Sequence, residues 1–171
     1  MLLSAGCAGP FGGPYAQAHV LVDEANEAIE EHNRPFKEAR LAYEGAREAV
    51  EAGESTEEAE RIAQARQIMQ EARDELKKVR EPLSEMQGLD VEPEIGQYAR
   101  DLSETADAQI SAEDREIDFY DLLEQDPTLE DSRTEAENIL SEVDDGYEEA
   151  KEAYERAQEL ANANPELLRE R

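Results

Sequence analysis

The strongest pattern in the sequence is a heptad repeat that covers residues 13–52. Large apolar residues recur every seven positions, and a line of mostly small residues follows three positions later. The large residues are Tyr15, Val22, Ile29, Phe36, Tyr43 and Val50, and the second line is Ala18, Ala25, His32, Ala39 and Ala46. Two such lines, three and four residues apart, are typical of a coiled-coil seam. The pattern predicts one long helix that ends at Gly53 and packs through both lines.

A second heptad pattern predicts a helix from Ser55 to about Gln87. Ser55 and Glu58 have the spacing of a capping box, which satisfies free backbone amides at a helix start. Gly88 is a favourable residue just past a helix end. The seam consists of Ile62, Met69, Leu76 and Leu83, with Ala65, Ala72, Val79 and Met86 beside it.

Two further helices are predicted in the second half of the chain. Pro93 suits the first turn of a helix, and apolar residues recur from there to about Gln125 with a period closer to 3.6. The polar residues Gln109, Glu113 and Glu116 interrupt this pattern, so the packing face stays open. Asp126 and Pro127 are then expected to cap and begin the last helix. That helix runs to about Ala163, with lines Ala136, Val143, Ala150, Ala157 and Leu140, Tyr147, Tyr154, Ala161.

The short breaks between these segments set the expected fold. Consecutive long helices joined by a few residues run antiparallel. The sequence therefore predicts an all-α protein, an elongated up-down-up-down bundle of about four long helices with coiled-coil-like seams. The bundle would cover residues 15–164, followed by a short C-terminal tail, residues 165–171. Exposed helix faces of this kind can serve a protein partner or self-association.

The charge of the chain narrows the choice of partners. Lys and Arg number 17 against 45 Asp and Glu, for a formal net charge of -28. This balance excludes a general nucleic-acid binder, which needs clustered basic residues to neutralise phosphates. Only four of the 17 basic residues are Lys. The excess of acid and the scarcity of Lys resemble the composition of proteins from salt-loving prokaryotes, in which about 1 M salt screens repulsion beyond about 3 Å.

The amino terminus carries a second resemblance. The residues Leu3-Ser4-Ala5-Gly6-Cys7 resemble the lipobox of bacterial and archaeal lipoproteins. The resemblance implies that residues 1–6 are the end of a signal peptide and that Cys7 carries a diacylglycerol-type lipid. Residues 7–14 would be a Gly/Pro-rich tether, and the protein would lie on the extracytoplasmic face of the cell membrane. Because an apolar signal region needs about 7–15 residues, we expect the true start to lie upstream of Met1.

The sequence offers little catalytic chemistry. Neither His19 nor His32 has the Glu three positions before it that a di-iron bundle requires, and a single Cys cannot form a Cys/His zinc cluster. The sequence contains no Gly-rich phosphate loop and no Ser-x-x-Lys. We therefore expect a non-enzymatic protein without a cofactor or a metal.

His32 is the one unusual residue in the seams, because it occupies a position of the small-residue line. It lies three residues before Pro35, which removes a helix hydrogen bond and predicts a kink. Two interpretations stay open. The His32 ring meets freed carbonyls or water, or His32 and Pro35 mark a small polar pocket or a pH-sensitive joint.

These observations favour a surface-anchored lipoprotein that acts as a helical-bundle scaffold or a partner-docking module. One alternative is an intracellular coiled-coil interaction protein in which Cys7 is incidental. Another is a ligand- or metal-binding bundle built around His32 and the tyrosines.

Overall fold

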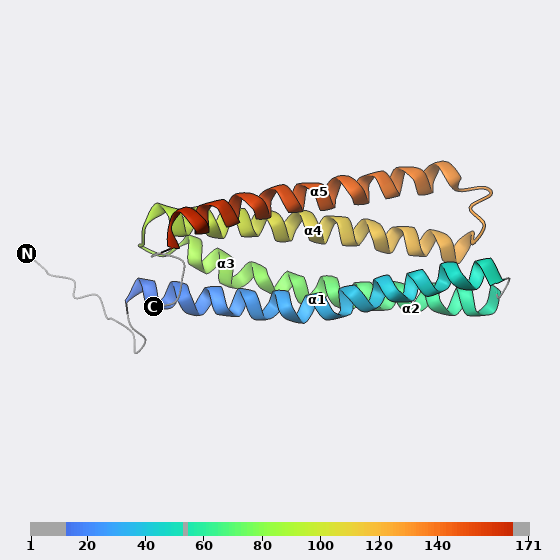
Figure 1. The fold of residues 1–171 in the computed structure, drawn as a ribbon, viewed down its shortest axis with the longest axis horizontal. Helices are drawn as coiled ribbons and strands as arrows, with labels where there is room; N and C mark the ends of the chain where they lie inside the picture. The colour runs from blue at the N-terminus through green and yellow to red at the C-terminus, as the bar shows by residue number, and fades with distance from the viewer. Residues whose placement is uncertain (1–12, 53–54, 166–171) are drawn as a thin grey trace, which may run out of the picture.

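A computed structural model describes residues 13–52 and 55–165. It contains five α-helices and one 3₁₀ turn, namely α1 (Pro14–Ala52), α2 (Ser55–Leu76), η1 (Lys77–Val79), α3 (Arg80–Gln87), α4 (Pro93–Gln125) and α5 (Arg133–Ala163). Because η1 joins α2 to α3 along one axis, the chain forms four long antiparallel arms (Figure 1). The predicted all-α up-down-up-down bundle is confirmed. Cys7, Gly53 and the tail beyond Pro165 lie outside the described residues.

The arm made of α2, η1 and α3 has the predicted packing face. All eight predicted seam residues are buried, and each is at most 3 % exposed. Their heptad spacing continues through η1, where the tighter turn keeps Val79 in the core. The arm lies between α1 and α4 and therefore forms the centre of the bundle.

The packing face of α1 differs from the prediction. The line of Ala residues and His32 is buried as expected, but the bulky line lies at the edge of the interface. Tyr15 and Val50 are about half exposed, at 45 % and 53 %. A third line is buried instead, consisting of Leu21, Ala28, Pro35, Ala42 and Ala49. The physical reason is close approach, because two neighbouring lines of mostly small residues let α1 lie tightly against the α2–α3 arm.

The start of α5 also differs from the prediction. The sequence predicts that the last helix begins at Pro127, whereas α5 begins at Arg133. Asp126 instead ends α4 and organises the connecting loop. Its Oδ2 accepts hydrogen bonds from the backbone N–H groups of Asp131 and Ser132 and from the Ser132 hydroxyl. Those bonds hold the loop in a turn conformation as far as Ser132, so the helix begins only after that residue.

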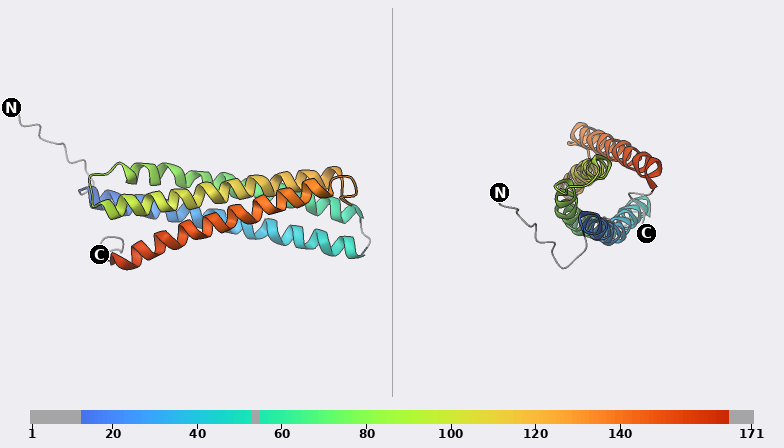
Figure 2. Two further views of the ribbon diagram at one scale, coloured as in Figure 1. Left: turned by 90° about the horizontal axis from the view of Figure 1, so that it is seen from above. Right: turned by 90° about the vertical axis from the view of Figure 1, so that its left-hand side faces the viewer.

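The four arms form an open arc rather than a closed ring. Seen end-on in Figure 2, α1 and α5 lie at the two ends of the arc, with the α2–α3 arm and α4 between them. α5 packs along α4, and one line of α5 is buried there, made of Ala136, Val143, Ala150 and Ala157. The other predicted line remains on the open side, where Leu140 is 41 % and Tyr154 is 46 % exposed. No helix in the described part of the chain is long and apolar enough to cross a membrane.

Candidate functional site: a pocket between the ends of the arc

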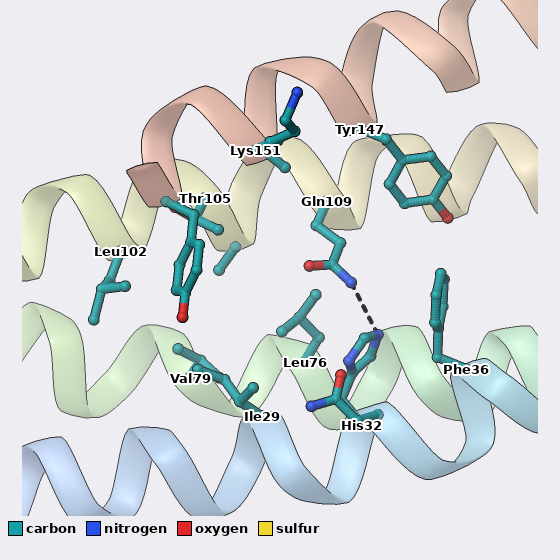
Figure 3. Close-up of a pocket in the computed structure, with 14 residues that line it drawn as sticks. Ile29, His32, Phe36, Leu76, Val79, Leu102, Thr105, Gln109, Tyr147 and Lys151 are labelled. Atoms are coloured by element: carbon teal, nitrogen blue, oxygen red, sulfur yellow. Dashed lines mark hydrogen bonds between the residues drawn. The ribbon is translucent and has the colours of Figure 1, made fainter. Parts of the chain in front are cut away.

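A pocket of about 450 Å³ lies on the open side of the bundle, between α1 and α5 (Figure 3). Its floor is formed by side chains from the central arm and from α4. Its lining residues are Ile29, His32, Asn33, Phe36, Leu76, Val79, Leu102, Thr105, Ala106, Gln109, Tyr147, Ala150, Lys151 and Tyr154. Most of these side chains are apolar or aromatic, and the polar ones are His32 and Asn33 from α1, Thr105 and Gln109 from α4, and Lys151 from α5. This mixture is typical of small-molecule sites, whose volumes run from about 300 to 1,000 Å³.

The polar part of the wall includes His32 of α1, which pairs with the buried Glu113 of α4 behind it. His32 Nε2 lies 2.7 Å from Glu113 Oε1, and the two side chains are 1 % and 0 % exposed. Gln109 Nε2 donates to the same Glu113 oxygen at 3.1 Å and lies 3.3 Å from His32 Nε2. The carboxylate oxygen therefore accepts from both the imidazole and the amide. Within the described residues, the second oxygen, Glu113 Oε2, is buried without a hydrogen-bond partner.

Glu116, one turn further along α4, is the centre of a second buried polar cluster. Its Oε1 accepts a 2.5 Å hydrogen bond from the Tyr120 hydroxyl, and its Oε2 accepts a 2.8 Å bond from the Tyr147 hydroxyl. Arg40 Nη2 lies 3.2 Å from Glu116 Oε2. Both oxygens of this buried carboxylate are thus satisfied, unlike those of Glu113. The cluster ties α1, α4 and α5 together at one level of the bundle.

Aromatic contacts bridge the gap between α1 and α5 at this level. The Phe36 and Tyr147 rings meet edge to face with centroids 6.0 Å apart. The Arg40 guanidinium lies 5.3 Å from the Phe36 centroid and 5.4 Å from that of Tyr147. In Figure 3 these two rings lie near each other at one end of the pocket. They bound the pocket there, and the open side of the bundle continues beyond Tyr154.

The buried carboxylates contribute to raising the pKa values of the tyrosines around them. Burial raises the pKa of Tyr147 well above its usual range, and the negative charges of Glu116 and Glu113 raise it further, with Arg40 opposing them only weakly. The pKa of Tyr120 is also strongly raised, first by burial and then by Glu116. Glu113 and Glu116 do not line the pocket themselves, so these carboxylates lie behind its wall.

The residues singled out from the sequence fall into different places. His32 lies in the pocket wall, and Pro35 is buried one turn later in α1, which runs unbroken from Pro14 to Ala52. No freed backbone carbonyl in the described structure bonds to the His32 ring; its hydrogen-bond partner is Glu113, and Gln109 Nε2 lies 3.3 Å from the same ring nitrogen. His19 is half-buried and does not line the pocket.

The residues that surround His32 appear in the sequence as polar interruptions of an apolar pattern. Gln109, Glu113 and Glu116 interrupt the apolar pattern of α4, but with Tyr120 they are spaced four, three and four residues apart. That spacing places all four on one face of a helix. A polar stripe in register with the core is a signal for a buried polar cluster, and it could have been recognised. The approach of Arg40 and Tyr147 from α1 and α5 carries no such local signal.

The described residues contain no group of three or more His, Cys, Asp or Glu side chains placed to hold a metal ion. The chemistry that the pocket offers is apolar contact, aromatic faces and a few hydrogen-bonding groups. Comparison with protein-family models, curated proteins and solved structures finds no match to this chain.

Proposed function

We propose that this chain is a non-enzymatic binding protein, held on the extracytoplasmic face of a prokaryotic cell membrane by a lipid on Cys7, which takes a small apolar ligand between α1 and α5. The observation that carries the binding role is the pocket of about 450 Å³, with mostly apolar walls and a few polar side chains. The anchoring role is supported by the sequence Leu3-Ser4-Ala5-Gly6-Cys7 alone.

The geometry favours a small ligand over a docked helix. Phe36, Arg40 and Tyr147 already bridge α1 and α5, so the gap between these helices is divided and does not form one continuous groove. A helix of several turns would have to displace these side chains, whereas a small molecule fits between Tyr147 and Tyr154 without displacing them. Those two tyrosines are seven residues apart, about 10 Å along the helix axis.

The binding role can be tested with a neutral apolar dye such as N-phenyl-1-naphthylamine, whose fluorescence rises in an apolar site. Asn33 is exposed and lines the pocket, so Asn33→Phe should obstruct the mouth without burying a new group. Asn26 is exposed on the same face of α1, one heptad earlier, and does not line the pocket. We expect saturable binding that Asn33→Phe abolishes and Asn26→Phe leaves intact. Equal binding by both variants would refute the pocket as the site.

The anchoring role needs a separate measurement. Intact-mass analysis of the protein from its native host should show a lipid-modified Cys7 and recovery in the membrane fraction. An unmodified Cys7 in soluble protein would remove the anchor from the proposal and leave the pocket unaffected.

A further inference from the structure

Gln109 presents a hydrogen-bond acceptor without a partner at the wall of the pocket. Its amide nitrogen, Nε2, donates to Glu113 Oε1 at 3.1 Å. An ionised carboxylate only accepts, so the nitrogen must lie on that side of the amide. The amide oxygen, Oε1, lies on the opposite side, and Figure 3 shows it directed away from the His32 ring. Among residues 13–52 and 55–165, no group donates to Gln109 Oε1.

This oxygen can be reached from the pocket. Gln109 lines the pocket and is only partly buried. Within the described residues, Glu113 Oε2 is the one buried side-chain atom without a hydrogen-bond partner. Gln109 Oε1 has no partner either, so it is not fully buried. A ligand that covers this oxygen must supply a donor or leave a carbonyl group without a hydrogen bond, which costs free energy.

The polar neighbours of Gln109 on this side of the pocket have already used their protons. Thr105, one turn earlier on α4, donates its hydroxyl to the Asp101 carbonyl at 2.8 Å. His32 donates from Nε2 to Glu113 Oε1, because the carboxylate only accepts. In the neutral ring, Nδ1 then carries no proton. A ligand with a donor group is therefore better matched to these side chains than one with only an acceptor.

The lining also favours a neutral ligand. It contains no carboxylate to offset a positive charge. Its one permanent cation, Lys151, is exposed and bonds to Glu148 at 3.1 Å. An anion would in addition be repelled by the net charge of -28. A charged group of either sign would lose hydration in the pocket without gaining a free partner of opposite charge.

We propose that the pocket binds a neutral, mostly apolar molecule with one hydrogen-bond donor, a hydroxyl or a ring N–H group, which donates to Gln109 Oε1. This rests on the proposed function, because it assigns a class of ligand to the same pocket. The apolar body of the ligand packs against Ile29, Leu76 and Val79, which line the pocket together with aromatic side chains.

Two probes of the same shape test the donor. 2-Phenylindole has a ring N–H group, and in 2-phenylbenzofuran an oxygen atom replaces it. Displacement of the neutral dye described above gives both affinities, at about 1 M KCl to screen the acidic surface. We expect 2-phenylindole to bind about fivefold more tightly, the ratio that one hydrogen bond allows. Biphenyl-4-carboxylate and 4-phenylbenzylammonium, which are of similar size, should both bind more weakly than 2-phenylindole.

Variants locate the acceptor. Gln109→Met keeps the length of the side chain and removes the amide oxygen. It should reduce the affinity for 2-phenylindole about fivefold and leave that for 2-phenylbenzofuran unchanged, whereas a merely structural effect would weaken both. Thr105→Val is the matched control, because it removes a second oxygen from the same helix face and should preserve the preference. If Gln109→Met fails to fold, the probe pair on the original chain, Thr105→Val and Asn33→Phe decides the matter.

The outcomes distinguish the two proposals. If both probes bind equally and Asn33→Phe blocks both, the pocket is a ligand site and the donor preference is wrong. Loss of the preference in Thr105→Val would overturn the assignment to Gln109. Tighter binding of either charged probe would refute the neutral class. If neither the probes nor the dye binds, the proposed function fails together with its ligand class.

Discussion

His32 on α1 and Glu113 on α4 form a buried pair, with Nε2 and Oε1 2.7 Å apart, although 81 residues separate them in the chain. The His32 side chain is 1 % exposed and the Glu113 side chain is 0 % exposed. A pair of this kind holds the two helices in one register, because any sliding would leave a carboxylate unpaired in the core.

Breaking this pair should be costly, whereas replacing both members should not be. His32→Leu leaves the Glu113 carboxylate buried without its partner and should lower the free energy of unfolding by about 3 to 5 kcal/mol. The double variant His32→Leu/Glu113→Leu removes the charge as well, and we expect its stability to return to the original value or exceed it. Urea unfolding of the original protein, His32→Leu, Glu113→Leu and the double variant in a double-mutant cycle measures the coupling. Additive losses in the double variant would show that the pair does not interact.

Tyr120 should contribute more through its hydroxyl than an exposed tyrosine does. Tyr120→Phe removes the 2.5 Å donor to the buried Glu116 Oε1 and should lower the free energy of unfolding by about 1 to 3 kcal/mol. Tyr154 is 46 % exposed, so Tyr154→Phe is the control and should change stability by less than about 0.5 kcal/mol. Thermal unfolding of both variants at fixed salt gives the comparison. Equal effects would mean that Glu116 does not need this donor.

The buried tyrosines should resist ionisation at high pH. Burial, followed by the charge of Glu116, raises the pKa values of Tyr120 and Tyr147 above the ordinary value of about 10. Because the folded pKa is raised, their stabilising contribution is complete below pH 10 and is lost as the pH rises further. Phenolate absorbance at pH about 11 should therefore stay below the total for six tyrosines while helicity persists. Full ionisation of all six in the folded protein would contradict the buried cluster.

At Gly146, α5 approaches α4 closely. A Cβ at this position would lie 3.0 Å from the Ala112 Cβ and 3.4 Å from the Ala112 Cα. Gly146→Leu should therefore overpack the interface and destabilise the protein by about 1 to 3 kcal/mol. At Gly96 in α4 the nearest atom is the end of the Arg100 side chain, 3.6 Å away, so Gly96→Ala should stabilise by about 0.5 to 1 kcal/mol. A stabilising Gly146→Leu, measured by thermal unfolding, would refute the tight helix contact.

Salt should stabilise the whole bundle. The net charge of -28 repels itself across the helix faces, and this repulsion weakens as the Debye length falls from about 10 Å at 0.1 M salt to about 3 Å at 1 M. Circular dichroism should show a melting temperature that rises steadily with KCl over that range. A melting temperature that falls or stays constant would remove the argument for a salt-rich setting. An equal ionic strength of a second monovalent salt controls for specific ion binding.

Several features of the fold follow from the sequence with little ambiguity. The bounds of α1, α2–α3 and α4, together with the buried seam of the central arm, were all predictable. A heptad pattern depends only on residues close together in the chain. Because the central arm packs between two other helices, its apolar seam is buried. The start of α5 was not predictable in the same way, because Asp126 bonds to Ser132 rather than to the next turn of a helix.

The candidate site was only partly visible. His32 stood out as a polar residue among alanines, and the polar stripe of Gln109, Glu113 and Glu116 lay in the α4 pattern without a predicted face. Which polar side chains meet depends on helix pairing, and residues 77 to 81 positions apart carry no local record of their contact. Only the packed bundle brings them together at one wall of the pocket.

The sequence by itself determined the helices, their antiparallel order and the acidity of the surface. Periodicity, capping residues and charge are properties of the sequence that do not depend on which helices pack together. The tertiary structure decided which line of α1 is buried and that the arms form an open arc. Which line of α1 is buried depends on how closely α1 approaches its neighbour. The small residues of α1 permit a close approach, and packing against the α2–α3 arm brings it about. The bulky residues Ile29 and Phe36 were thereby left at the edge of the core, where with Tyr147 they became the walls of a pocket.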